Sequence, residues 1–439
     1  MTNPLASIVI GAGPAGLGPL VCAMQHNEHI ELLNQGVAWI EAQSSIGSGS
    51  LGDHAISSDT SASVLLECLE GANNPLSILT NSPEAEAVRL YGSGSIPLQV
   101  GGRFLNAMGQ VMENAIRTHP RSELLLKQRA ARIVVRDTND FIVELADGTT
   151  RSSRSVVFAM GGYQERDETL SRFVKPELQL HDTYAEKCIL TSELFSHDGL
   201  QTVMARLKQA TRPRVVLIGS SHSALTAAHL LLEAGLDFDK QAVSVMYKRP
   251  PRVFYPDQAS AYADGYQEFG EADICPTTGR IYRLAGLRMA ARELLRRTLG
   301  LGDTQREDRL ELCSLSDMTV DDVRARLDRA TVIVPAFGYR PRTLPVFTAQ
   351  GKRIQLLTET GPRQPMVDNN CRILAAGGTH LPGMYGIGLA SGFVPRGPKL
   401  GGEPSFDGQT NGLWLYQNGI GRIVLDHMLR HTQPQMIAI

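Results

Sequence analysis

Residues 7–16 read Ser-Ile-Val-Ile-Gly-Ala-Gly-Pro-Ala-Gly, and this stretch decides how the chain begins to fold. Its first four residues are a short apolar run, which predicts a buried strand. Residues 14–25 predict a helix, because proline suits the first helical turn. The Gly-x-Gly-x-x-Gly loop between them allows a tight turn, close approach of a pyrophosphate and close packing of helix on strand. The residues expected to hold a dinucleotide are Gly11, Ala12, Gly13, Pro14, Ala15 and Gly16.

An acidic residue ends the next predicted strand. Residues 37–40 are apolar, and Glu41 follows 25 residues after the last glycine of the loop. The usual separation is about 20 residues. A carboxylate at this point accepts hydrogen bonds from an adenosine ribose and repels a 2′-phosphate. The first loop is therefore expected to bind FAD or NAD rather than NADP; the alternative is a merely structural turn.

A second loop of the same kind follows the predicted strand at residues 214–218 and precedes a helix at 223–234. Here serine and alanine replace the second and third glycines. The next strand, residues 243–247, ends in Lys248 and Arg249 instead of an acid. Two cations favour a 2′-phosphate and hence NADPH, although they could also be a solvated surface pair. The other residues expected at this second site are Gly219, Ser220, Ser221 and Ser223.

Further strands alternate with helices along the chain, which predicts an α/β fold. An antiparallel pair is expected over residues 130–145 with a turn at 137–140, and a final helix over 413–429. Residues 391–412 are rich in Gly, Pro and polar side chains and predict a long loop, which in a compact domain is often functional. Single strands are expected at 155–159, 331–334 and 372–376.

Composition narrows the class of protein. The 439 residues carry a net charge of −2, so nucleic acid is not an expected partner. No apolar run approaches about 18 residues, and no targeting segment is apparent, so we expect a cytoplasmic protein without membrane contact. The six cysteines form no C-x-x-C pair and no zinc-ligand spacing, which predicts reduced thiols and no metal.

Two dinucleotide loops in one chain suggest hydride transfer between two cofactors, and the chain resembles the two-dinucleotide-binding-domain flavoproteins at these loops. Residues 156–162 and 334–341 also resemble their two crossover strands, and residues 374–378 resemble the late strand that meets the flavin. The resemblance implies a Rossmann-like FAD-binding domain interrupted by a second Rossmann-like NAD(P)H-binding domain. The boundaries expected from it are 1–195 and 341–439 for the FAD-binding domain and 205–340 for the inserted one.

The resemblance also implies a subclass. Disulfide reductases of this group need a close redox cysteine pair, which this sequence lacks. The second loop, ending Ser223-Ala224, and residues 337–341 are similar to segments of the class B flavin monooxygenases. Among these the N-hydroxylating enzymes acting on ornithine or lysine are nearest in character. A Baeyer–Villiger fingerprint is not found.

The resemblance places the flavin near the residues that follow the second strand. His54 and Asp59 lie there and are candidate catalytic residues, for proton transfer or substrate orientation, although both could be ordinary turn and cap residues. Gly377, Gly378 and Gly388 are expected near the flavin. Arg280 and Arg288 could bind a carboxylate, with surface solvation as the alternative.

The leading hypothesis is an NADPH-using, FAD-dependent monooxygenase that hydroxylates a small molecule with O₂, through a flavin C4a-hydroperoxide and at an amine nitrogen. A second hypothesis is an NAD(P)H:acceptor reductase without oxygen insertion. A third is a protein that holds the cofactors without turnover. The sequence does not settle the substrate, and a homo-oligomer is compatible with it.

Overall fold

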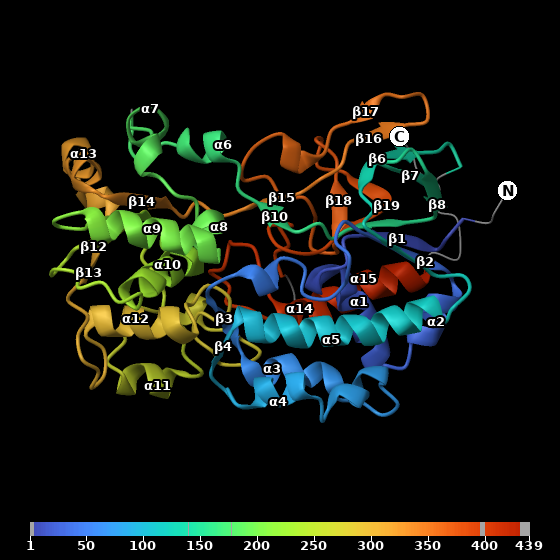
Figure 1. Cartoon of the computed structure of the whole chain (residues 1–439), viewed down its shortest axis with the longest axis horizontal. Coiled ribbons are helices and arrows are strands. Elements are labelled where there is room, and N and C mark those ends of the chain that lie inside the picture. Colours follow the sequence, from blue (N-terminus) through green and yellow to red (C-terminus); the bar gives the residue numbers. More distant parts are fainter. Residues whose placement is uncertain (1–3, 139, 177, 396–399, 431–439) are drawn as a thin grey trace.

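The computed structural model describes residues 4–138, 140–176, 178–395 and 400–430. Figure 1 shows two sheets, each built mainly of parallel strands, that lie side by side along the longest axis of the molecule. The turn predicted at 137–140 and the loop predicted at 391–412 include Asn139 and residues 396–399, which lie outside the described residues. Within the rest of that loop there is no helix or strand, as expected.

The first sheet has six strands in the order β18-β19-β9-β1-β2-β5. All are parallel except β18, which pairs antiparallel with β19. Every residue of β1, β2 and β9 is buried, as parallel sheets covered on both faces require. The strands are β1 (Ser7–Ile10), β2 (Val37–Glu41), β5 (Glu123–Leu126), β9 (Val156–Phe158), β18 (Arg372–Leu374) and β19 (His380–Gly386).

The helix that follows β1 is built from small residues. The helix α1 (Pro14–Gln25) packs against α14 (Leu413–Gln417) and α15 (Gly419–Arg430). A Cβ on Gly18 would lie 2.1 Å from the carbonyl oxygen of Tyr416, and one on Gly421 would lie 2.0 Å from the same oxygen. The close approach of these helices therefore depends on glycine. The single final helix predicted at 413–429 is two helices, interrupted at Asn418.

The second sheet has four parallel strands in the order β13-β12-β11-β14. It interrupts the chain of the first sheet, and we call it, with its helices, the inserted unit. Figure 1 shows the inserted unit on the left and the first sheet on the right. Its strands are β11 (Val215–Ile218), β12 (Val243–Tyr247), β13 (Leu310–Ser314) and β14 (Val332–Pro335), and its helices include α9 (His197–Gln209), α10 (His222–Leu232), α12 (Met289–Leu299) and α13 (Val320–Arg329).

The predicted fold class, one Rossmann-like unit interrupted by a second, is confirmed. The numerical domain boundaries stay predictions. A third, five-stranded sheet lies beside the first and has the order β17-β16-β6-β7-β8. Its strands are β6 (Ala130–Val135), β7 (Phe141–Leu145), β8 (Thr150–Ser153), β16 (Val346–Thr348) and β17 (Arg353–Ile354), of which β6 and β7 are the predicted antiparallel pair.

The two chain crossings between the sheets are held together. β10 (Gly162–Tyr163) leaves the first sheet, β15 (Arg340–Pro341) leaves the second, and the two pair antiparallel. A further small sheet pairs β3 (Ser57–Ser61) with β4 (Ser95–Pro97). The β3 strand packs against α12 and so joins the first unit to the inserted unit.

One long helix was not predicted from the sequence: α5 (Leu98–Arg117), whose buried face includes three glycines. The shorter helices are α2 (His29–Asn34), α3 (Ala62–Leu66), α4 (Pro83–Arg89), α6 (Arg166–Leu170), α7 (His181–Tyr184), α8 (Thr191–Leu194) and α11 (Gln258–Ala263). All six cysteines are buried and unpaired. Among the described helices, none is both long and apolar enough to span a lipid bilayer.

Replacing Gly16 with alanine is expected to destabilise the fold itself. A Cβ on Gly16 would lie 1.9 Å from the carbonyl oxygen of Gly11, which is backbone and cannot move aside cheaply. Overpacking of this kind costs about 1–3 kcal/mol of unfolding free energy. Denaturant unfolding of the flavin-free protein measures it. The control is Gly270→Ala, where an added Cβ has no heavy atom within 4 Å; equal midpoints for the two variants would contradict the expectation.

Candidate functional site

The first glycine loop runs from β1 into α1, and backbone contacts require its outer glycines. Gly11 has a φ of +100°, and a Cβ there would lie 2.4 Å from the carbonyl oxygen of Ala159, at the end of β9. The indole nitrogen of Trp39 donates a hydrogen bond to the carbonyl oxygen of Gly16 at 3.2 Å. These contacts hold the start of α1 against the carboxyl edge of the first sheet.

A Cβ added to the middle glycine of this loop would meet no close contact. Gly13 has φ −77° and ψ −171°, a conformation open to most residues, and the nearest atom to an added Cβ would be Gly49 Cα at 3.6 Å. No side chain caps the N-terminus of α1, and Pro14 stands in its first turn. The N-terminus of α1 therefore presents uncapped N–H groups and the positive end of the helix dipole. They lie beside the space that a Cβ on Gly13 would fill. This cradle fits a pyrophosphate.

Glu41 lies at the same loop, as predicted from its place after β2. Its carboxylate is buried and accepts hydrogen bonds from the N–H of Ala12 at 2.7 Å and the N–H of Gln43 at 2.8 Å. Each carboxylate oxygen keeps a second lone pair, so a ribose hydroxyl could still donate to it. The carboxylate is therefore fixed in place by the protein before any nucleotide binds.

The segment that follows passes between the first loop and α5. The N–H of Gly47 donates to the carbonyl oxygen of Ala12 at 3.1 Å, and the N–H of Ser48 donates to Asn106 Oδ1 at 2.9 Å. A Cβ on Gly109 would lie 2.1 Å from the carbonyl oxygen of Ile46. Sequence reasoning missed α5, although its glycines at 102 and 109 are seven residues apart and therefore share one helix face.

The second loop repeats the geometry of the first. Gly219 has a φ of +137°, and a Cβ there would lie 2.6 Å from the carbonyl oxygen of Ala336, just after β14. The hydroxyl of Ser220 donates to the carbonyl oxygen of Arg249 at 2.7 Å. Ser221 is the residue before α10, is exposed, and makes no side-chain cap, while Ser223 lies in the first turn. The loop thus offers a second uncapped helix start.

Lys248 and Arg249 lie beside this loop and are exposed, as the prediction of a 2′-phosphate site requires. The Ser220 hydrogen bond ties the backbone of Arg249 to the loop. The Arg249 guanidinium forms an ion pair with Asp407 at 2.8 Å.

A charged group from the first unit faces the second loop. Burial lowers the pKa of His222, the first residue of α10, while the nearby carboxylate of Asp59 acts to raise it. His222 Nε2 accepts a hydrogen bond from the backbone N–H of Arg288 at 3.1 Å, so the ring proton is on Nδ1 when the ring is neutral. Asp59, from β3, therefore meets the inserted unit at the start of α10.

The two predicted catalytic residues are placed differently. His54 forms an isolated bridge with Ser196, and burial lowers the pKa of its imidazole despite the opposing charge of Asp53. Asp59 is exposed on β3 and interacts with His222. Among the described residues, no hydrogen bond joins His54 to Asp59.

The prediction that Gly377 and Gly378 lie near the flavin is wrong. They form an exposed turn between β18 and β19, with the N–H of Gly378 bonded to the carbonyl oxygen of Ala375 at 2.8 Å. Because β18 is antiparallel, this turn is at the edge of the sheet opposite the glycine loop. The strand that ends beside the loop is β19. Gly388 follows it, and a Cβ there would lie 3.2 Å from the Cβ of Ala15.

A turn with a strained backbone presents arginines beside the second loop. Tyr282 and Met289 have φ values of +45° and +49°, which is costly for residues with side chains and is typical of functional sites. Arg288 donates to the carbonyl oxygen of Arg283 at 2.6 Å, and its guanidinium lies 4.1 Å from the centre of the Phe254 ring. We call residues 282–289 the arginine turn.

The arginine turn carries an excess of positive charge. Burial lowers the pKa of Arg288, and the neighbouring guanidinium groups of Arg280 and Arg283 lower it further, while the carboxylates of Asp59 and Glu403 act to raise it. Within the described residues, no carboxylate hydrogen-bonds to the Arg288 guanidinium. Arg283 was not singled out from the sequence, because only the strained turn brings it beside Arg288.

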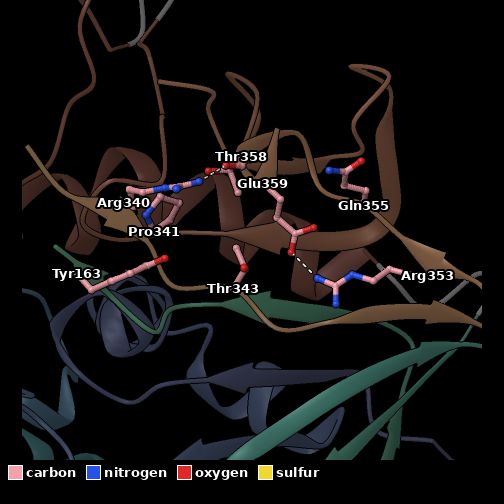
Figure 2. A pocket seen from close by; sticks show the side chains of 8 residues that line it. All are labelled: Tyr163, Arg340, Pro341, Thr343, Arg353, Gln355, Thr358 and Glu359. Atoms are coloured by element: carbon pink, nitrogen blue, oxygen red, sulfur yellow. Dashed lines mark hydrogen bonds and ion pairs between the residues drawn. The ribbon is translucent and has the colours of Figure 1, made fainter. Parts of the chain in front are cut away.

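Two cavities lie near the contacts between the units. One of about 760 Å³ is lined by Pro276, Thr277, Leu284, Val394, Pro395, Gly401, Gly402, Glu403, Pro404, Phe406 and Asp407. The other, of about 710 Å³, is shown in Figure 2 and is lined by Tyr163, Arg340, Pro341, Thr343, Arg353, Gln355, Thr358 and Glu359. In the second cavity the charges are already paired: Arg353 with Glu359 at 2.9 Å, and Arg340 with Glu168 at 2.5 Å. It lies at the chain crossings and not at either glycine loop.

Solved structures of similar fold include amine monooxygenases and a cyclohexanone monooxygenase. A cadaverine monooxygenase from Erwinia amylovora, solved with FAD, is 14% identical with a TM-score of 0.55, covering 99% of this chain and 98% of that one. L-lysine 6-monooxygenase from Pseudomonas syringae is 13% identical with a TM-score of 0.51, covering 98% and 100%. At such identities the likeness establishes the fold.

Sequence comparison establishes the family. No family model matches the chain. A curated protein, CMP-5′-(3-aminopropyl)phosphonate hydroxylase from Streptomyces rubellomurinus, is 30% identical over 443 residues, covering 98% of this chain and 98% of that protein. The resemblance to class B flavin monooxygenases is confirmed. This chain belongs to the family of that hydroxylase, and it has the two-Rossmann fold of the class B flavin monooxygenases.

Proposed function

We propose that this protein is an FAD-dependent, NADPH-using monooxygenase that hydroxylates the amine nitrogen of a small anionic substrate. The observation that carries the proposal is the pair of glycine loops, each of which leads from a strand into a helix with no side-chain cap and contacts the end of a crossover strand. They occur in a chain that matches a hydroxylase over 98% of both sequences. The overall reaction is R–NH₂ + O₂ + NADPH + H⁺ → R–NHOH + H₂O + NADP⁺. We also propose a cytoplasmic location.

The first loop supports FAD as its ligand. The uncapped start of α1 beside Gly13 suits a pyrophosphate, and the fixed carboxylate of Glu41 suits an adenosine ribose. Gly388, which packs on Ala15 at the end of β19, permits close approach of the chain to the ligand. Bound FAD would accept a hydride from the nicotinamide and supply the oxygen activation that no side chain provides.

The second loop supports NADPH. The strand β12 ends at Tyr247 and is followed by Lys248 and Arg249, so the strand end itself carries cations and no acid. The hydrogen bond from Ser220 ties the backbone of Arg249 to the loop, which supports Arg249 as a partner for the 2′-phosphate. NADPH is therefore favoured over NADH.

The arginine turn supports an anionic substrate. The relative's name specifies an amine on a phosphonate that is linked to CMP. We propose that this chain takes a substrate of the same class, a primary amine carried on a phosphonate or phosphate group. The strained backbone keeps Arg283 and Arg288 near each other, which costs conformational free energy. In this proposal, hydrogen bonds from the arginines to an anionic ligand offset that cost.

His54 remains our candidate for moving protons. A protonated amine has no free lone pair, so it must lose a proton before its nitrogen can be hydroxylated. Burial lowers the pKa of His54, so its imidazole is neutral at pH 7 and able to accept that proton. For Asp59 we propose a positioning role, since it lies on β3, which packs against α12, and its charge acts on His222 and Arg288.

The amine substrate distinguishes this proposal from the reductase alternative. Purified enzyme with NADPH, O₂ and (3-aminopropyl)phosphonate or its CMP conjugate is expected to give a product 16 Da heavier by mass spectrometry, the mass of one oxygen atom. NADPH oxidation is expected to rise with amine concentration. An acceptor reductase would instead oxidise NADPH with a dye acceptor and return the amine unchanged.

Replacing Gly13 with valine is expected to remove FAD without unfolding the protein. The backbone at Gly13 accepts a side chain and no protein atom blocks it, but the branched side chain would occupy the pyrophosphate's place. Flavin absorbance of the purified variant measures occupancy, and circular dichroism reports the fold. Gly377→Ala serves as control, because nothing lies within 4 Å of its added Cβ. A valine variant with full flavin content would refute the assignment of the first loop.

Replacing Arg288 with glutamine is expected to weaken binding of the anionic end of the substrate. Loss of one hydrogen bond to a charged group corresponds to a rise of about tenfold or more in KM. The KM for n-propylamine, which lacks an anion, should not change, and Arg288→Lys should recover part of the loss. Arg324→Gln, on exposed α13, is the matched control. An equal rise for both amines would argue for a structural role of Arg288.

A further inference from the structure

A segment near the C-terminus is fastened to the inserted unit. We call residues 400–407 the strap. The carbonyl oxygen of Leu400 accepts a hydrogen bond from Arg283 Nη1 at 2.8 Å, and the N–H of Gly402 donates to Cys275 Sγ at 3.3 Å. The buried carboxylate of Glu403 accepts from the N–H groups of Leu284 and Ala285, at 3.0 and 2.8 Å. The near end of the strap is therefore held on the arginine turn.

The middle of the strap is fastened as well. The N–H of Ser405 donates to the carbonyl oxygen of Ala272 at 2.8 Å, and its hydroxyl donates to Asp273 at 2.5 Å. Burial by itself would raise the pKa of Cys275, but hydrogen bonds from Thr277 and other donors lower that pKa to about 6, which makes the sulfur a strong acceptor.

The same loop begins and ends at the first unit. The N–H of Thr410 donates to the carbonyl oxygen of Phe393 at 2.9 Å, and the N–H of Ala390 donates to Asn411 Oδ1 at 3.3 Å. Gly388, just before it, packs on the first turn of α1. The chain therefore runs from the first glycine loop across to the inserted unit and back, and its strap lines the cavity of about 760 Å³.

The far end of the strap is the residue that pairs with Arg249. The two carboxylate oxygens of Asp407 lie 2.8 and 2.9 Å from Arg249 Nη1. Both side chains are more than 70% exposed, so water and solutes reach the pair. Unlike the other strap contacts, this one is a single solvent-exposed ion pair, and such pairs are weak and readily exchanged.

A carboxylate and a 2′-phosphate compete for one guanidinium. Both present oxygens to the N–H donors of arginine, and the phosphate carries the larger negative charge. Their like charges repel, so each anion weakens the binding of the other to Arg249. NADH has no 2′-phosphate and leaves the pair of Asp407 and Arg249 undisturbed.

We propose that Asp407 is a specificity-determining residue of the NADPH site: its carboxylate holds the Arg249 guanidinium in the nucleotide-free enzyme, and the 2′-phosphate displaces it. Displacement frees the outer end of the strap while Glu403 and Ser405 keep the rest on the inserted unit. Binding of the reductant is thereby coupled to the wall of the neighbouring cavity. This inference rests on the proposed use of NADPH at the second loop.

The test measures how fast NADPH or NADH reduces the flavin of the FAD-loaded enzyme in the absence of oxygen. Stopped-flow absorbance records the reduction over a range of nucleotide concentrations and gives an apparent Kd for each nucleotide. Asp407→Asn removes the competing charge while keeping the size of the side chain. It is expected to lower the apparent Kd for NADPH by about two- to fivefold and to leave that for NADH unchanged. In an Arg249→Gln background the same change is expected to have no effect on either nucleotide.

A matched control separates this mechanism from a change in net charge. Asp321→Asn also removes one exposed carboxylate paired with an arginine, Arg324 at 2.6 Å, but on α13. It should alter neither Kd. If Asp407→Asn strengthens NADPH and NADH equally, or still acts without Arg249, the inference is overturned.

Failure of the proposed function gives a different result. If Arg249→Gln weakens NADPH but Asp407→Asn does nothing, only the inference about Asp407 is overturned. If Arg249→Gln itself affects NADPH and NADH equally, the 2′-phosphate site is wrong, and the inference is overturned with it.

Discussion

Two points where one backbone touches another without an intervening side chain hold this structure together. Gly11 abuts the carbonyl oxygen of Ala159, and Gly219 abuts that of Ala336, each at the end of the strand from which the chain crosses to the other unit. A Cβ at either glycine would push the crossover strand away from the loop. Because β10 and β15 pair just beyond these contacts, the two loops are held relative to one another through the same crossings.

Charged side chains lie where β3 of the first unit contacts the inserted unit. Asp59 from the small β3 strand faces His222 and Arg288 of the inserted unit. The carboxylates of Asp59 and Glu403 together compensate part of the positive charge of the arginine turn. The strap adds a second bridge, since it joins the chain after β19 to the arginine turn through Glu403.

Elements with strong local patterns were predicted closely. The strand β1 and the helix α1 begin and end where the apolar run, the glycines and Pro14 indicate, and β12 covers the predicted residues. The prediction for the late strand was wrong, because the direction in which a strand pairs decides which end of it lies beside the glycine loop. Residues 374–378 resemble a strand that meets the flavin, yet β18 is antiparallel, and β19 takes that place. The helix α5 was missed because its glycines, which weaken a helical pattern, are needed where Ile46 and Gly52 approach it.

Sequence reasoning located both glycine loops and predicted a different ligand for each, because the glycine spacing, the strand before the glycines and the charge after the next strand are all local features. The packing of the units brings Arg249 to Asp407, which is 158 residues away, and brings Arg288 within the electrostatic influence of Asp59. Such pairs depend on which surfaces pack, and no local period or propensity encodes that. The proposed ligands of the loops were therefore predictable from the sequence, whereas the charged residues that surround the loops were identified only in the folded structure.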